Sequence, residues 1–303
     1  MKIATILTVY NRREKTLRCL RHLFAALETY NRSADNGVGL TVFLTDDGCT
    51  DGTAEAVKAE FTDKDIHILQ GTGSLFWAGG MRLAWQAAID TGTKWDYYLL
   101  LNDDTNVFEN VFDELFESES YEVKEFRKEG IVSGFTCDPE DKEKTTYCGL
   151  NFVNWTKGRQ VRIKPTGKPQ HIDLTNANIL LVPASVVETI GIFHKGYRHG
   201  CADNDYSMMA HRHKIPVYST AHICGECEHD HHTQEEEIKM LSTLSKEERE
   251  KYVKSATHSD RDYLLFVRRN MPLRYPFAVL VRGVRVYCPS LYHLITSLRG
   301  VYR

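Results

Sequence analysis

Acidic side chains follow apolar segments at two places in the first third of the chain. In "YYLLLNDDTNVFE" (97–109), five apolar or aromatic residues lead to Asp103 and Asp104, and "LTDDGCTDGT" (44–53) places Asp46 after a second apolar run. Carboxylates that share a cleft repel each other unless a cation compensates their charge. Mg²⁺ and Mn²⁺ prefer carboxylate oxygen and keep coordination positions for substrate, so the pattern predicts a divalent metal that bridges to phosphate oxygens.

These acids need strands that end at one edge of a sheet. Strands are expected at 2–10, 40–45, 65–69 and 95–101, and they alternate with helices expected at 14–30, 53–61 and 81–90. Such alternation implies βαβ units with right-handed crossovers, and hence a parallel sheet. Ligands bind at the carboxyl ends of the strands in open α/β sheets, where "TVYNR" (8–12) would join the acidic segments.

The pattern changes from about Gly130. Shorter segments with turn signals, such as Asp138-Pro139 and Lys164-Pro165, predict antiparallel or mixed strands. Residues 233–252 are charged and predict a solvated helix or helix pair. The predicted fold class is α/β, with a Rossmann-like, mostly parallel sheet flanked by helices, a mixed second half and a helical C-terminal appendage.

Composition is that of an ordinary globular protein. The 303 residues are 42% hydrophobic and 26% charged, and the net charge of −3 gives no reason to expect a nucleic-acid partner. Eight scattered cysteines in a chain of this size favour a reducing compartment, so we expect a cytoplasmic protein. The first residues, "MKIATILTVYNRREK", turn polar and basic where a signal peptide would need a cleavage site, which predicts a first strand instead.

The segment 261–303 is strongly basic. It contains eight arginines and one acid, Asp262, which gives a net charge of +7. Its apolar runs are shorter than the roughly 20 residues that span a bilayer. Arginines among aromatic and aliphatic residues suit an interfacial helix on the inner face of an anionic plasma membrane. The alternative is that they decorate helices packed on the rest of the protein.

Soft metal ligands are densest in "HICGECEHDHH" (222–232). Cys224 and Cys227 are separated by two residues and followed by three histidines, a spacing that could bind structural zinc. Zinc loops usually bring a second, distant ligand pair, and only Cys201 and isolated histidines offer themselves here. Zinc at this segment therefore stays one of two interpretations.

Five motifs occur in a fixed order: "TVYNR", "TDDGCTDGT" (45–53), "GSLFWAGGMR" (73–82), "LLNDDT" (100–105) and a segment from "LLVPAS" to "RHKI" (180–215). Over residues 1–225 they resemble glycosyltransferase family 2, the inverting enzymes of the GT-A fold. "LFWAGGMR" and "LNDDT" are similar to its rhamnosyltransferase-like branch. The resemblance implies a catalytic domain at 1–232 and a helical, basic region at 233–303. It also implies transfer from a UDP- or dTDP-sugar to a saccharide or lipid-linked saccharide acceptor in bacterial surface polysaccharide synthesis.

The resemblance implies a donor site at the sheet edge. Asp46 would bind the nucleotide base beside the backbone of Val9 and Tyr10. Asn102 stands where the family has the first Asp of a metal-binding D-x-D and would donate a hydrogen bond near the sugar, while Gly71 and other glycines would let the backbone approach the donor. The donor-binding residues implied are Thr8, Val9, Tyr10, Arg12, Asp46, Gly73, Trp77, Gly79, Gly80, Arg82, Asn102 and Asp103. For Trp77, packing in the core is the other interpretation.

Mn²⁺ or Mg²⁺ is the cofactor that the resemblance implies. Asp104 would be the principal ligand, and either Asp103 or water would fill a second position. The family commonly has a histidine after the base-bearing helix that reaches the metal or the diphosphate. Among the candidates we name His229 as a ligand, and the others are His222, His231 and His232.

Inverting transfer needs a general base that deprotonates the acceptor hydroxyl as it attacks the anomeric carbon. "CADNDY" (201–206) stands where the family has E-D-x-D, with Ala202 in place of the Glu. Asp203 would be the catalytic base and Asp205 would contact the acceptor. A carboxylate can serve as base in a partly dehydrated cleft, which raises its pKa. The alternative is that Asp203 or Asp205 caps the helix that follows.

Two other classes of protein can be weighed from the same residues. A nicotinamide-dependent Rossmann enzyme needs G-x-G-x-x-G directly after the first strand, and "TVYNRREK" has no glycine there. A noncatalytic protein that binds a sugar nucleotide or a polysaccharide would keep the fold, but it would have no use for both a metal site and Asp203.

Overall fold

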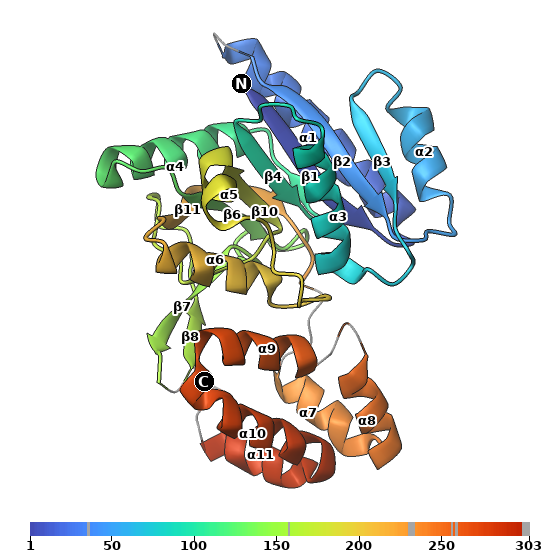
Figure 1. Ribbon diagram of the computed structural model, residues 1–303, viewed down its shortest axis with the longest axis vertical. Helices are drawn as coiled ribbons and strands as arrows, with labels where there is room; N and C mark the ends of the chain where they lie inside the picture. Colours follow the sequence, from blue (N-terminus) through green and yellow to red (C-terminus); the bar gives the residue numbers. More distant parts are fainter. Residues whose placement is uncertain (35–36, 157, 230–233, 256, 258–259, 299–303) are drawn as a thin grey trace.

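The first third of the computed structural model confirms the predicted alternation of strands and helices (Figure 1). The structure describes residues 1–34, 37–156, 158–229, 234–255, 257 and 260–298. β1 pairs in parallel with β2 and β4, and β2 with β3. The elements are β1 (Lys2–Val9), α1 (Arg13–Ser33), β2 (Gly39–Asp46), α2 (Thr53–Glu60), β3 (Ile66–Gln70), α3 (Phe76–Asp90) and β4 (Tyr97–Leu101).

Helix α3 begins at Phe76, before the predicted start at Met81. Gly79 and Gly80 each disfavour a helix by about 1 kcal/mol relative to Ala, which is why the pattern did not include them. A Cβ atom on Gly80 would lie 2.0 Å from Thr8 Oγ1. The glycine therefore lets α3 pack directly on β1, and this tertiary contact outweighs the local preference.

The second half is mixed, as predicted. The large sheet has the order β3-β2-β1-β4-β10-β6-β11-β5, and β10 and β5 run against the other strands. A small antiparallel sheet has the order β8-β7-β9. The elements are β5 (Asn106–Val107), α4 (Val111–Phe126), β6 (Ile131–Cys137), β7 (Gly149–Asn154), β8 (Arg159–Arg162), β9 (Leu174–Thr175), β10 (Ile179–Pro183), α5 (Ala184–Ile190), α6 (Ala202–Arg212) and β11 (Val217–Glu226).

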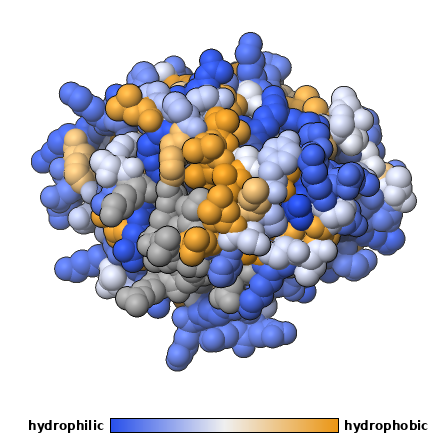
Figure 2. All heavy atoms as spheres, turned by 90° about the horizontal axis from the view of Figure 1, so that it is seen from below, coloured by the Kyte–Doolittle hydropathy of each residue, from blue (hydrophilic) through white to orange (hydrophobic). Residues whose placement is uncertain are grey.

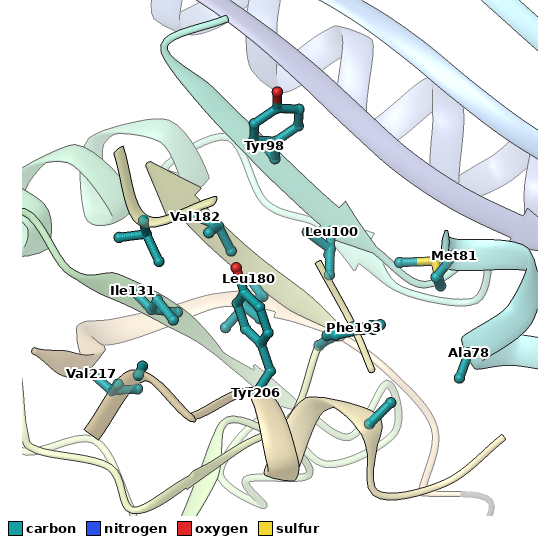
Figure 3. Close-up of a cluster of buried hydrophobic side chains, with 14 of the residues drawn as sticks. Ala78, Met81, Tyr98, Leu100, Ile131, Leu180, Val182, Phe193, Tyr206 and Val217 are labelled. Carbon is teal, nitrogen blue, oxygen red and sulfur yellow. The ribbon is translucent and has the colours of Figure 1, made fainter. Parts of the chain in front are cut away.

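One face of the large sheet packs against α3 and α6 (Figure 3). Leu100 of β4, Leu180 of β10 and Ile131 of β6 are fully buried, and Tyr206 of α6 lies against them. Burying side chains of this size stabilises the fold by about 1.5–3 kcal/mol each. Tyr206 therefore fixes α6, and with it the residues at the start of α6, relative to the sheet.

The C-terminal helices lie together below the large sheet in Figure 1. They are α7 (Gln234–Thr243), α8 (Lys246–Lys254), α9 (Asp260–Asn270), the 3₁₀ helix η1 (Pro272–Arg274), α10 (Tyr275–Tyr287) and α11 (Pro289–Leu298). The predicted helix pair over 233–252 is confirmed for its described part, and a capping box of Ser245 and Glu248 begins α8. None of the described helices is both long and apolar enough to cross a membrane.

Helix α9 joins this helical region to the rest of the protein. The buried carboxylate of Asp262 accepts backbone N–H bonds from Arg198 and His199, at 3.1 and 2.8 Å. Arg269 pairs with the buried Asp205 at 3.1 Å. The helical region thus holds the loop before α6 and α6 itself.

An apolar surface covers η1, α10 and α11, and Figure 2 shows apolar residues gathered on this underside of the molecule. Leu273 is 97% exposed, Leu280 64% and Leu294 53%. Three of the basic residues nearby are used internally, since Arg269 pairs with Asp205, and Arg282 and Arg285 face Asp260. Part of the predicted positive charge therefore decorates packed helices.

The parallel strands of the large sheet end at one edge. Val9 at the end of β1 lies opposite Asp46 at the end of β2, and Asp103 and Asp104 follow β4. β11 ends at Glu226, so Cys227 reaches the same edge. This is the edge at which the sequence predicted a ligand site.

Candidate functional site

A cavity of about 560 Å³ opens at the carboxyl edge of the sheet. Its size suits a small-molecule ligand. The sequence-predicted residues that line it are Thr8, Val9, Tyr10, Arg12, Gly73, Trp77, Asn102, Asp103, Asp104 and Asp203. The structure therefore brings the end of β1, the "NDD" segment and the start of α6 to one cavity.

Asp103 and Asp104 face a cation. Arg12 Nη1 donates to Asp104 Oδ2 at 2.5 Å and lies 3.5 Å from Asp103 Oδ1, while the Thr16 hydroxyl donates to Asp103 Oδ2 at 3.4 Å. Burial, and then the charge of Asp104, raises the pKa of Asp103 to about 7, although Arg12 opposes the change. The pair is thus an acidic site that gains from positive charge, and the exposed Arg12 side chain supplies it here.

Cys227 brings a soft ligand to this acidic pair. Its Sγ lies 3.7 Å from Asp104 Oδ1, and Asn178 Nδ2 donates to it at 3.4 Å. Carboxylate oxygens suit Mn²⁺ or Mg²⁺, whereas a thiol suits a softer ion such as Zn²⁺. Asp103 and Asp104 would hold the expected hard cation, and Cys227 would add a ligand for a softer one.

Of the four histidines considered as metal ligands, the structure describes His222 and His229, and neither lines the cavity. The ring of His229 stacks on Tyr147, its Nε2 lies 3.2 Å from Arg162, and it does not line the cavity. His222 faces Glu114, with its Nδ1 2.7 Å from the carboxylate. His231 and His232 lie outside the described residues.

The predicted zinc pair does not come together at the cavity. Cys224 lies fully buried in the hydrophobic core, with its Sγ 3.7 Å from the carbonyl oxygen of Phe135, whereas Cys227 lines the cavity. Cys201 also lines the cavity, at the start of α6.

Asp203 lies in the first turn of α6 and lines the same cavity as the "NDD" segment. Its Oδ1 accepts from Asn204 N at 2.8 Å and its Oδ2 from Ala177 N at 3.3 Å. Burial raises the pKa of Asp203 to about 6, while these backbone bonds lower it. The residue that caps α6 is Cys201, which makes no side-chain cap bond. Asp203 therefore lines the cavity with a carboxyl group whose pKa lies well above its ordinary value.

Asp205 lies outside the cavity, only 1% exposed. Arg269 pairs with it, and Asn270 Nδ2 donates to it at 2.7 Å. The structure thus places the predicted acceptor residue in a buried ion pair between α6 and α9. Asn204, its neighbour in sequence, lines the cavity instead.

The two acids after β2 have different surroundings. Asp46 Oδ1 accepts from Cys49 N at 2.7 Å, and Asp46 does not line the cavity. Asp47 does, and its carboxylate accepts from Gly73 N and Phe76 N, both at 2.9 Å. Asp47 therefore anchors the loop that leads into α3.

Three further predicted donor residues lie outside the cavity. Gly79 and Gly80 are buried within α3. Arg82 donates from its Nη1 to the carbonyl oxygens of His194 and Tyr197, at 3.3 and 2.9 Å, and so braces the loop before α6. Trp77, in contrast, lines the cavity, and its indole N–H donates to Asn102 Oδ1 at 2.8 Å, which fixes the amide.

Several cavity residues escaped the sequence analysis. Asn176, Ala177 and Asn178 precede β10, and they reach the edge because β10 starts there and runs against its neighbours. The sequence predicted antiparallel or mixed strands in this half of the chain, but it did not indicate which strand reverses. Asp47 and Cys227 lie inside the motifs "TDDGCTDGT" and "HICGECEHDHH", but the sequence alone does not show that their side chains face the cavity.

Comparison with known proteins places the fold. Neither a family model nor a curated protein matches the sequence. Among solved structures, S. aureus TarS 1–349 is similar with a TM-score of 0.53 and 11% identity, over 95% of this chain and 75% of that one. The same protein in complex with UDP-GlcNAc gives a TM-score of 0.51 and 12% identity, over 91% and 73%. With the sheet order, this likeness shows the expected GT-A type of fold.

Proposed function

We propose that the protein is an inverting glycosyltransferase that moves a sugar from a UDP- or dTDP-sugar to a hydroxyl of a saccharide or lipid-linked saccharide. The observation that carries this proposal is one cavity lined both by the Asp103–Asp104 pair and by Asp203. A structure of the similar TarS fragment was determined with UDP-GlcNAc, which supports a nucleotide-sugar donor. The motifs "LFWAGGMR" and "LNDDT" favour a hexosyl or deoxyhexosyl transferase of surface polysaccharide synthesis.

Each group has a place in the reaction. A divalent cation at Asp104 would stabilise the charge of the leaving diphosphate. Arg12, which is long and partly exposed, would turn from the carboxylates to the diphosphate. Asn102, held by Trp77, would orient the sugar. Asp203 would take the proton from the acceptor hydroxyl as that oxygen attacks the anomeric carbon and the bond to the diphosphate breaks.

The contacts between the two parts of the chain support a different role for each part. Residues 1–232 would carry donor binding and chemistry, and residues 233–303 would support α6 through Asp205 and Arg269. Asp46 would act by shaping the turn that presents Asp47.

The deciding experiment is a screen of nucleotide sugars for binding to the protein, by thermal shift in Mn²⁺ or Mg²⁺, followed by calorimetry with the best donor. A UDP- or dTDP-sugar should bind in the presence of metal and lose its affinity in excess chelator. If no nucleotide sugar binds, or if chelator leaves transfer unchanged, the proposal fails.

A noncatalytic binding protein is the alternative, and slow donor hydrolysis separates the two. A transferase without its acceptor should hydrolyse the donor slowly through Asp203, and Asp203→Asn should suppress this while donor binding persists. Donor binding without any turnover in either protein would favour the binding protein.

The apolar surface on η1, α10 and α11 suits the membrane on which a lipid-linked acceptor lies. Residues 263–303 contain no acid, so nothing in this segment repels anionic lipid. The exposed Leu273 and Leu280 can insert at the headgroup boundary. We place the protein at the inner face of the plasma membrane.

Co-sedimentation with vesicles tests this placement. Leu280→Glu should reduce binding to vesicles that contain phosphatidylglycerol, whereas Val153→Glu, at an exposed apolar position on β7, should not. Equal binding of both variants to the vesicles would show that the apolar surface on η1, α10 and α11 does not bind the membrane. A concentration-dependent dimer that Leu280→Glu dissolves would assign it to a second copy instead.

A further inference from the structure

Two histidines and an aspartate meet at the C-terminal end of α6. His171, Asp173 and His211 each offer one ligand atom, and these atoms all lie within 4.8 Å of one another. None of the three lines the cavity that contains Asp203. This cluster is therefore separate from the proposed glycosyltransferase site.

The backbone holds the first two residues in place. His171 forms a β-bridge with Tyr218 of β11, and its ring lies edge-on to that of Tyr218. Ile172, between them, is fully buried. Asp173 Oδ2 accepts from Phe152 N of β7 at 2.7 Å, while Oδ1 lies 3.8 Å from His171 Nδ1, too far for a hydrogen bond.

Two backbone carbonyl groups fix the tautomer of His211. Its Nε2 lies 2.9 Å from the carbonyl oxygen of Ile172 and 3.2 Å from that of Asp173, so this nitrogen must donate its proton. A neutral ring that donates through Nε2 carries its lone pair on Nδ1. Histidine ligands of metals are typically fixed by such a bond from the other ring nitrogen to a backbone carbonyl.

We propose that His171, Asp173 and His211 bind Zn²⁺, with water as the fourth ligand. Two imidazole nitrogens and one carboxylate oxygen are a three-ligand set that Zn²⁺ accepts. Mg²⁺, which prefers oxygen ligands, has little use for imidazole. With bonds of about 2.0–2.1 Å, tetrahedral ligands lie roughly 3.3 Å apart, so the cluster must contract, and the half-exposed His171 ring can turn to close it.

The ion would clamp two segments that are distant in sequence, residues 171–173 and the C-terminal end of α6. Residues 171–173 are already tied to β7 through Phe152 and to β11 through Tyr218, and the ion would reinforce the hydrogen bonds that His211 makes to their backbone. A ligand that binds only the folded state stabilises it. Zn²⁺ would thus stiffen the end of α6 opposite the turn that carries Asp203.

Binding is tested on the chelator-stripped full chain by competition for Zn²⁺ with a chromophoric chelator, in excess Mg²⁺ to occupy the acidic cavity. His171→Ala should weaken Zn²⁺ binding at least about tenfold, and it should abolish the Zn²⁺-dependent rise in melting temperature. His213→Ala removes an exposed histidine from the same helix end and is the matched control, which should behave as wild type. If His171→Ala and wild type bind Zn²⁺ equally, the proposal is overturned.

A second measurement guards against other binding sites and against misfolding. X-ray absorption of the Zn²⁺-loaded Cys227→Ser variant, which lacks the thiol beside Asp104, should show nitrogen and oxygen ligands with imidazole scattering, whereas a sulfur shell at about 2.3 Å would move the ion to another cysteine and refute the site. His211→Gln can still donate to the Ile172 carbonyl, so this variant should remain folded in the absence of metal. It should lose Zn²⁺ binding as His171→Ala does, and retained binding would contradict the ligand set.

Discussion

Both edges of the large sheet bury an acid, but they surround it differently. At the carboxyl edge, Asp103 has Arg12 and Thr16 as partners and opens into the cavity. At the amino edge, Glu122 of α4 lies fully buried against Gly130, and its carboxylate has no hydrogen-bond partner among the described residues. Burial raises the pKa of Glu122 to about 9 and that of Asp103 to about 7. The two pKa values are thus raised by the same cause, but only Asp103 shares a cavity with other polar groups.

We expect the largest effect on activity from a substitution of Asp104, at the carboxyl edge of the sheet. Asp104→Ala should abolish transfer and remove metal-dependent donor binding, because it deletes the proposed principal metal ligand. Asp63→Ala, at an exposed acid before β3, serves as the control. Calorimetry with donor and Mn²⁺ measures the loss. Wild-type affinity in the variant would mean that Arg12 alone serves the diphosphate.

Asp203→Asn should lower kcat by at least about 10², while donor affinity stays nearly unchanged, since the amide cannot accept the acceptor's proton. Because its folded-state pKa is about 6, wild-type kcat should rise as pH increases through about 6 and then level off. Stopped assays from pH 5 to 8 follow this limb. Near-normal turnover in the variant would exclude Asp203 as the base.

Cys227→Ser tests whether the thiol of Cys227 binds the metal ion. The thiol beside Asp104 should give bound Co²⁺ a sulfur-to-metal charge-transfer absorption band. The serine variant should lose that band and bind Co²⁺ about tenfold more weakly. Cys201→Ser, at another cavity cysteine, should keep both properties. A band that survives in Cys227→Ser would place the ion on another thiol.

Glu122→Gln should have the smallest effect on activity, because it should change stability instead. The unfolded carboxyl ionises near pH 4.5 and the folded one near pH 9, so wild-type stability falls as pH rises between these values, by up to about 1.4 kcal/mol per pH unit. The glutamine cannot ionise. Its advantage in melting temperature should therefore be largest at pH 8–9 and shrink toward pH 5.

Glu125→Gln, at an exposed position on the same helix, should show no such trend. A pH-independent difference between Glu122→Gln and wild type would show that Glu122 is not a buried neutral acid. Unchanged transfer in Glu122→Gln would confirm that the amino edge is structural.

The sequence was informative where structure is local. The strands that end at Val9 and Leu101 follow from apolar runs and breakers, so Asp103 and Asp104 could be placed at the sheet edge. Contacts between distant segments could not be foreseen. Arg269, which pairs with Asp205, is 64 residues away in sequence. The local motif could not reveal this pair, so it predicted that Asp205 contacts the acceptor.

The same limit explains the remaining differences. The reversal of β10 and the insertion of β11 beside β6 decide that Asn178 and Cys227 enter the cavity. Both depend on strand pairing, which the sequence does not encode at short range. Asp46 and Asp47 are adjacent and identical in type, and only the loop from Gly73 to Phe76 distinguishes them.

The ion pair between Asp205 and Arg269 bears on how this chain could be shortened or recombined. Removing one partner of a buried pair leaves an uncompensated charge and destabilises a protein by roughly 3–5 kcal/mol. A protein truncated after residue 232 would leave Asp205 in that state, and it would release the backbone N–H groups of Arg198 and His199 that Asp262 now holds. The helical tail is therefore not an exchangeable module, and hybrids with a foreign tail should work only if it supplies an arginine and an aspartate at these two points.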